Sequence, residues 1–175
     1  MNSMTIKSRR FAFLAACVAV VTSAVAATTG WHGLSQSQRD NRIKMRALAE
    51  LGHSTGLQCK EWVREVVDDA SSGEVIIPAT RPNNYQWYNH PYIQSYSQGC
   101  PPPGVAPGRI IQMVWHNQSN NNVSPHTAIV YSTTSSGMTW IDCNWQGDGV
   151  VRMHYVSYTN FQACVGSEYT LYKIR

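Results

Sequence analysis

The apolar residues of this chain follow a helical period in one part of the sequence and a strand pattern in another. Between residues 35 and 70 they recur at helical spacing, in two segments that contain neither proline nor glycine. After Gly108, Gly, Asn and Ser clusters separate short runs of β-branched and aromatic residues, as in successive strands. Because the helical and strand segments follow one another instead of alternating, the pattern predicts an α+β domain with helices packed on an antiparallel sheet.

We expect residues 27–175 to form a single domain, in which these helices and strands follow one another. The first predicted helix, residues 35–51, belongs to an N-terminal arm of residues 27–52, and the second helix covers residues 57–70. Residues 78–108 are rich in Pro, Asn, Tyr and Gly, which predicts a long ordered loop whose aromatic side chains line a groove or pack on the sheet. About five strands are expected, at residues 109–115, 126–132, 138–144, 150–158 and 169–174.

The first 26 residues have the pattern of a secretory signal peptide. Three basic residues at positions 7–10 precede an apolar stretch over residues 11–21, and small residues up to Ala26 suit cleavage there. We therefore expect a secreted or periplasmic protein. Residues 14–17 resemble a lipoprotein box, but the apolar stretch continues past Cys17, so attachment to a membrane by a lipid is not favoured.

The charge of the mature chain argues against nucleic acid as a partner. Cleavage removes three of the 14 basic residues and none of the 10 acidic residues, which leaves a net charge of +1. A nucleic-acid-binding protein needs a clustered positive face. The histidines His90, His116 and His154 lack the spacing of zinc ligands, so neither a metal nor another cofactor is expected. We expect the protein to be a monomer.

Export changes how the cysteines are interpreted. The mature chain keeps four, and outside the cytosol an even number suggests disulfide bonds. A nucleophilic cysteine would leave three for pairing. A bridge between Cys100 and Cys164 is predicted, because it would hold the long loop in place. The four cysteines are Cys59, Cys100, Cys143 and Cys164.

Cys59 is the cysteine best placed for chemistry, because it falls in the first turn of the second predicted helix. The partial positive charge at a helix N-terminus, helped by a nearby imidazolium, lowers the pKa of a thiol. The free N–H groups of the same turn can bind a developing oxyanion. A cysteine at this position can equally be buried or disulfide-bonded, so the position alone leaves its role open.

His126 and the segment around Asp142 supply partners for such a thiol. His126 is the first residue of an otherwise apolar predicted strand, where a strand edge facing a cleft suits a general base. Strand alternation puts Asp142 and Asn144 on one face and Cys143 on the other. Either Asp142 or Asn144 could therefore accept the Nδ1–H of His126 and hold its tautomer.

Four segments in this order resemble the CHAP family of cysteine, histidine-dependent amidohydrolases and peptidases. There a Gln-Cys pair opens the first core helix, as Gln58 and Cys59 do here. The Pro-Gly turn before residue 110, the His-hydrophobic strand and the acid-x-Asn-aromatic strand follow in the same order. Arg109 replaces the usual Asp, and Asp142 stands where Glu is common. The matching segments are residues 56–63, 107–113, 125–130 and 141–145.

The resemblance implies a papain-like fold in which Cys59 is the nucleophile and His126 the general base. Asp142 or Asn144 would orient the histidine, and Gln58 with the Cys59 N–H would form the oxyanion site. The expected substrate-binding aromatic residues are Trp87, in the aromatic loop, and Trp145.

The implied activity is that of a secreted cysteine peptidase or amidase that cleaves amide bonds of bacterial peptidoglycan or of muropeptides. The alternative is a non-catalytic exported binding module on the same frame. Such a module would use its aromatic loop to hold a cell-wall fragment or a partner protein.

Overall fold

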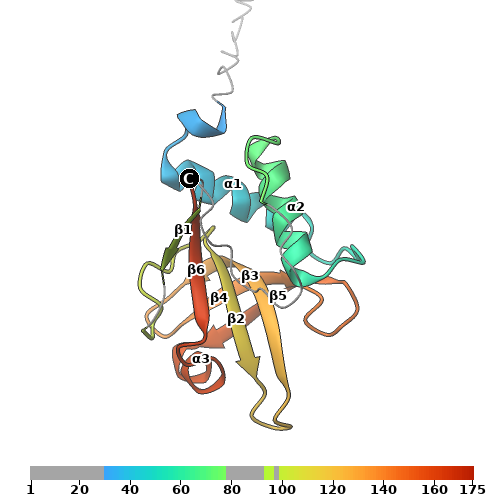
Figure 1. Ribbon diagram of the computed structural model, residues 1–175, viewed down its shortest axis with the longest axis vertical. Coiled ribbons are helices and arrows are strands. Elements are labelled where there is room, and N and C mark those ends of the chain that lie inside the picture. Colours follow the sequence, from blue (N-terminus) through green and yellow to red (C-terminus); the bar gives the residue numbers. More distant parts are fainter. Residues whose placement is uncertain (1–29, 78–92, 97–98) are drawn as a thin grey trace, which may run out of the picture.

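The computed structural model of the protein describes residues 30–77, 93–96 and 99–175. The α+β arrangement predicted from the sequence is confirmed (Figure 1). Among these residues no helix is long and apolar enough to cross a bilayer. The elements in chain order are a 3-10 helix (Trp31–Gly33), α1 (Gln36–Ala49), α2 (Cys59–Ser71), β1 (Ile93–Tyr96), β2 (Ile110–His116), β3 (Val123–Thr133), β4 (Gly137–Cys143), β5 (Val151–Ser157), α3 (Tyr158–Cys164) and β6 (Tyr169–Ile174).

The strands form one antiparallel sheet in the order β1-β6-β2-β3-β4-β5, with helices on both faces. Helices α1 and α2 pack on each other and on β3, with further contacts to β4 and β6 (Figure 1). Helix α3 packs on β4 and β5. Alternate strand residues point to the two faces, so that Ile129 lies in the core under α1 and α2 while Ala128 and Val130 lie in a second core cluster.

Helices α1 and α2 begin and end close to the predicted limits, because local capping contacts set these limits. A capping box at the start of α1 joins the Ser35 side chain to the backbone N–H of Gln38, and the Gln38 side chain to the backbone of Ser35. Helix α2 stops at Ser72, which adopts a left-handed conformation with φ of 57°. The apolar face of α2 is completely covered by the sheet and α1.

Within the described part of the chain the sheet has one strand more than the five expected, since β1 lies within the predicted loop of residues 78–108. It pairs with β6 through backbone groups, so no local pattern is needed to specify it. The predicted strand of residues 150–158 ends at Ser157, whose side chain accepts a hydrogen bond from Asn160 N and begins α3. Strand β3 starts at Val123, so His126 lies inside it and not at its first position.

The predicted bridge between Cys100 and Cys164 is absent, because all four cysteines among the described residues are free thiols. The two sulfurs have different partners on α3. The Cys100 Sγ donates to Tyr158 O at 3.2 Å, and the Cys164 Sγ donates to Asn160 Oδ1 at 3.5 Å. The predicted signal peptide and Trp87 lie outside the described residues.

The start of β2 is attached to α1 by a close backbone contact. Gly108, with φ of 85°, lies so near Asp40 that an added Cβ would come within 2.0 Å of the Asp40 backbone oxygen. The next residue, Arg109, forms an ion pair with the Asp40 carboxylate at 3.1 Å, and both side chains are largely buried. Arg109 therefore connects the sheet to α1, a contact that a carboxylate at this position could not make with Asp40.

We expect Gly108→Ala to destabilise the fold by more than about 2 kcal/mol, because a left-handed conformation costs alanine roughly 1–2 kcal/mol and the clash adds to that. Gly52→Ala is the matched control, since Gly52 has φ of 84° and open space around it. The measurement is urea unfolding of both variants. Equal losses of unfolding free energy would show that the contact between Gly108 and α1 does not constrain the fold.

Candidate active site

Cys59 opens α2, and the loop before it is bound to the end of the sheet. Thr55 N donates to Gly149 O at 2.9 Å, and the Thr55 hydroxyl accepts from Leu57 N at 3.1 Å. Gln58 is the N-cap residue, in an extended conformation. These contacts fix the first turn of α2 against the residues that follow β4, and so determine where the Cys59 sulfur lies.

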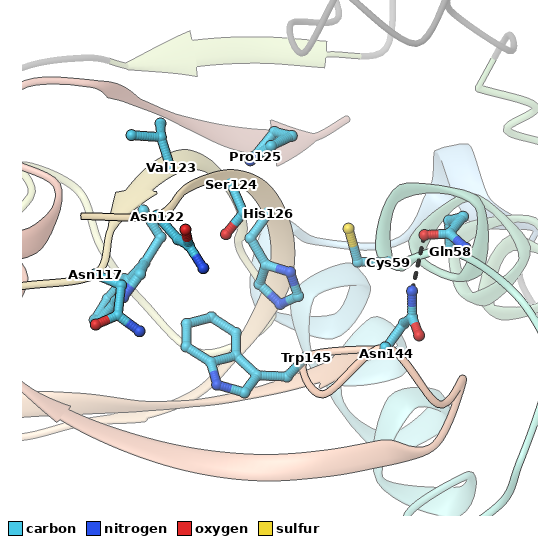
Figure 2. A pocket seen from close by; sticks show the side chains of 12 residues that line it. Gln58, Cys59, Asn117, Asn122, Val123, Ser124, Pro125, His126, Asn144 and Trp145 are labelled. Carbon is cyan, nitrogen blue, oxygen red and sulfur yellow. Dashed lines mark hydrogen bonds between the residues drawn. The ribbon is translucent and has the colours of Figure 1, made fainter. Parts of the chain in front are cut away.

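His126 on β3 lies opposite this sulfur, as Figure 2 shows. Its Nε2 is 3.2 Å from the Asp142 Oδ2 in an ion pair. The pairing of β3 with β4 sets this contact, because Asp142 is opposite Ala128, two residues along from His126. The ring nitrogen that remains for Cys59 is Nδ1. The expectation that Nδ1 would face the carboxylate is therefore wrong, because Nε2 contacts Asp142 and Nδ1 is on the side of Cys59.

Asp142 is fully buried, with polar side chains around its carboxylate. Trp140 Nε1 donates to the Asp142 Oδ2 at 2.7 Å, and His154 Nε2 lies 3.4 Å from the Asp142 Oδ1. The sequence reasoning missed His154, because it weighed this residue only as a metal ligand. Strand alternation was the available signal. Trp140 and Asp142 share one face of β4, and His154 on β5 pairs opposite Trp140 on that face.

Asn144 does not lie on the same strand face as Asp142, contrary to the prediction from strand alternation. Strand β4 ends at Cys143, and Asn144 adopts φ of 66°, which turns its side chain away from the strand's alternation. Its Nδ2 donates to the Gln58 Oε1 at 2.8 Å, and its Oδ1 accepts from Gly149 N at 2.8 Å. Asp142 is therefore the residue of the two that contacts His126. Cys143, as predicted, faces the opposite side and is buried in the core.

A pocket of about 610 Å³ opens beside these residues. Trp145 forms one wall, with its ring edge-on to His126 at 4.7 Å between centroids. Trp145 also packs against His154, at 5.4 Å between centroids. Among the residues that the structure describes, the lining contains aromatic and amide side chains but no Asp, Glu, Lys or Arg. Its residues are Gln58, Cys59, Trp115, Asn117, Asn122, Val123, Ser124, Pro125, His126, Asn144, Trp145 and Gly147.

The electrostatics of the site favour a thiolate paired with an imidazolium. Burial raises the pKa of the Cys59 thiol, but the hydrogen bond and charge of His126 outweigh burial and bring that pKa below its usual value. Backbone N–H groups of Thr127 and Lys60 add to this lowering. Burial lowers the pKa of His126, but Asp142 and Cys59 outweigh burial and raise it to about 9.

The pKa of the Asp142 carboxyl is below its usual value, since His126 and His154 overcome the opposing effect of burial. The carboxylate therefore stays ionised beside His126. Among the described residues no three His, Cys, Asp or Glu side chains are placed to hold a metal ion. The arrangement can supply a nucleophile, a proton donor and a fixed anion that orients the donor.

Comparison with known proteins identifies the fold but no family. No protein-family model matches the chain, and no curated protein matches it. The crystal structure of Ly7917 is similar with a TM-score of 0.49, at 14% identity over 81% of this chain and 63% of that chain. The crystal structure of Ly7917 with the hydrolyzing product of MDP has a TM-score of 0.50, at 14% identity over 80% of this chain.

The chain thus spans 63% of the length of both solved chains. At this level of identity the likeness shows a shared fold.

We expect iodoacetamide at pH 7 to label Cys59 before any other described cysteine, because burial raises the pKa of Cys100, Cys143 and Cys164. An ordinary thiol, with a pKa of ~8.5, is mostly protonated at this pH. Mass mapping of the labelled peptides over time measures the order.

His126→Ala is expected to slow labelling of Cys59, since it removes the charge that lowers the thiol pKa. Labelling of Cys100 in the same sample is the internal control. Equal labelling rates for Cys59 and Cys100 in the unaltered protein would contradict the assignment of a thiolate at position 59.

Proposed function

We propose that the protein is a secreted cysteine peptidase or amidase that cleaves amide bonds of bacterial peptidoglycan. The observation that carries the proposal is that Cys59 and His126 line one pocket together, with the buried carboxylate of Asp142 behind His126. The sulfur begins a helix, the imidazole faces the sulfur, and a buried carboxylate contacts the far nitrogen of the imidazole. Each group has the pKa direction that its role requires.

The first half of the reaction uses the thiolate and the imidazolium together. The Cys59 Sγ attacks the amide carbonyl carbon, and the carbonyl electrons move to oxygen. The N–H of Cys59 and the amide of Gln58 stabilise this oxyanion. His126 then gives its Nδ1 proton to the leaving nitrogen, the carbon–nitrogen bond breaks, and a thioester remains on Cys59.

The second half regenerates the site. Neutral His126 takes a proton from water, and the resulting hydroxide attacks the thioester carbonyl through a second oxyanion. The carbon–sulfur bond breaks, which releases a carboxylic acid and restores the Cys59 thiolate beside the imidazolium. Asp142 stays ionised throughout and keeps the His126 Nε2 turned away from the sulfur.

Three observations support peptidoglycan as the substrate class. The pocket lining offers amide side chains and tryptophan rings, which suit the amides and sugar rings of a muropeptide. The residues 1–26 would direct the protein to the compartment that holds the cell wall. A protein of the same fold, Ly7917, was crystallised with the hydrolyzing product of MDP, muramyl dipeptide.

We expect Cys59→Ala to abolish the release of fragments from purified sacculi and muropeptides, because no other described cysteine reaches this pocket. Mass analysis of the soluble fragments after incubation measures cleavage and identifies the bond. Cys164→Ala serves as the matched control, since it removes a buried thiol that contacts Asn160 on α3 and does not line the pocket.

A non-catalytic binding module predicts a different result for the same two variants. In that case the unaltered protein would release no fragments, and Cys59→Ala would bind sacculi as well as the unaltered protein in a sedimentation assay. Near-normal circular dichroism of Cys59→Ala excludes loss of fold as the reason for lost cleavage.

The alkaline limit of activity tests the pairing of His126 with Asp142. Activity needs protonated His126, so kcat/KM is expected to fall as pH rises through about 9. Asp142→Asn removes the anion that raises the pKa of His126. The alkaline limb should therefore move to lower pH, by about 1–2 units for a charge at this distance.

Asp148→Asn is the control for this shift, because it makes the same change at an exposed carboxylate that pairs with Arg152. Its pH profile should keep the alkaline limb near 9. An Asp142→Asn profile with an unmoved alkaline limb would mean that the carboxylate does not sustain the charge of His126.

A further inference from the structure

The pocket continues past His126 onto the hairpin turn, residues 117–122, that joins β2 to β3. Cys59 lies toward Thr127 on β3, since the backbone N–H of Thr127 donates to its sulfur. In the opposite direction along β3 from His126, the lining continues through Ser124 to Asn122. Figure 2 shows the same order, with Cys59 on one side of the imidazole and Asn122 on the other. The imidazole therefore lies between the sulfur and the hairpin turn.

This order distinguishes the two halves of an amide substrate. In the proposed reaction Cys59 attacks the carbonyl carbon, and His126 gives its proton to the leaving nitrogen. A proton donor must lie within about 3 Å of the nitrogen that it protonates, so this nitrogen lies on the imidazole side of the sulfur. The amine half of the substrate then points toward the hairpin turn. The acyl half points toward the other end of the lining, where Gln58 and Asn144 lie.

The hairpin turn offers hydrogen-bond donors from two asparagine side chains. The Asn117 Oδ1 accepts from Ser119 N at 2.9 Å and from the Ser119 Oγ at 2.7 Å, so the NH2 group is the end of this amide left for a ligand. In Figure 2 the amide nitrogens of Asn117 and Asn122 are both on the side of Trp145. Both residues line the pocket, so both can donate to an acceptor that lies in it.

Two tryptophan rings form the wall beside these amides. Trp115 and Trp145 meet edge-on at 5.2 Å between centroids, and both are half-buried and line the pocket. Among the described lining residues none carries a formal charge at neutral pH except Cys59 and His126, which belong to the reacting pair. Amide donors beside indole rings suit an uncharged peptide, whose carbonyl oxygens accept hydrogen bonds and whose side chains pack on the rings.

We propose that the hairpin turn and the first residues of β3 bind the amine half of the substrate as an uncharged peptide segment, whose carbonyl oxygens accept from Asn117 and Asn122. This inference rests on the proposed hydrolase function. Val123 is three residues from His126, about 10 Å along an extended strand, which gives length for about three residues of an extended peptide. A charged group in this segment would find no opposite charge in the described lining beyond the reacting pair.

Asn122→Ala is the most direct test, because the backbone of Asn122 makes the contacts that hold the turn. Asn122 N donates to the Asn120 Oδ1 at 3.0 Å, and Asn122 O accepts from Asn117 N at 2.8 Å. Mass analysis of a sacculus digest first identifies the acid product and the amine product, and each is then added as an inhibitor. We expect the inhibition constant of the amine product to rise about 3–10-fold, the value of one hydrogen bond, and that of the acid product to stay unchanged.

Two further measurements separate donation to the amine half from a general structural role. Asn122→Asp keeps the shape of the side chain but has no donor, so it should weaken the amine product at least as much as Asn122→Ala does. The acid product coupled to an aminocoumarin has no peptide on its amine side. For this substrate kcat/KM should therefore be the same in the unaltered protein and in Asn122→Ala.

Gln118→Ala is the matched control, because it removes an exposed amide of the same turn that does not line the pocket. It should leave both inhibition constants unchanged. The proposal is overturned if Asn122→Ala weakens the acid product alone, weakens both products equally or weakens neither, or if Asn122→Asp binds the amine product as well as the unaltered protein. In each of these cases the unaltered protein still cleaves, so the hydrolase function stands. If the unaltered protein releases no fragments, the hydrolase function and this binding site both fail.

Discussion

The carboxylate of Asp142 is the group on which the site depends, because a fully buried charge must be paired or hydrogen-bonded to be tolerated. Trp140 supplies a donor, and His126 and His154 supply the nearby rings. Those contacts fix more than the carboxylate. They hold the Nε2 side of His126 toward the sheet, which leaves Nδ1 for Cys59. The tautomer and orientation of the proposed base follow from the need to satisfy one anion.

The Cys59 sulfur lies beside the His126 imidazole because the start of α2 and the end of β4 are held next to each other. The loop before α2 is bound to the residues after β4 through Thr55 and Gly149, and Gly149 packs so closely on Gly56 that an added Cβ would lie 3.0 Å from it. The N-terminal turn of α2 therefore lies beside the end of β4, where it also contacts β3. A helix whose apolar face is buried under α1 and the sheet cannot slide from this position without exposing that face.

How much could be predicted from the sequence depends on how far apart the interacting residues are along the chain. Helical spacing and the absence of Pro and Gly located α1, and β-branched and aromatic runs located most strands, because these signals are local. Strand β1 depends on backbone pairing with β6, and His154 gains its role only through the register of β5 on β4. Neither has a signal within its own segment. Cys59, His126 and Asp142 were found because their residue types and order carry chemical information.

Asn144 shows why alternation alone could not assign the orienting residue. Residues 142 and 144 share a face only while the strand continues, and β4 ends between them. The positive φ of Asn144 turns its side chain toward the start of α2. One short segment therefore contacts both elements beside the pocket: Asp142 pairs with His126 on β3, and Asn144 contacts Gln58 at the start of α2. The Asp142 carboxylate is thus oriented by the sheet side chains and the Asn144 amide by the start of α2, so each of the two satisfies one geometric demand.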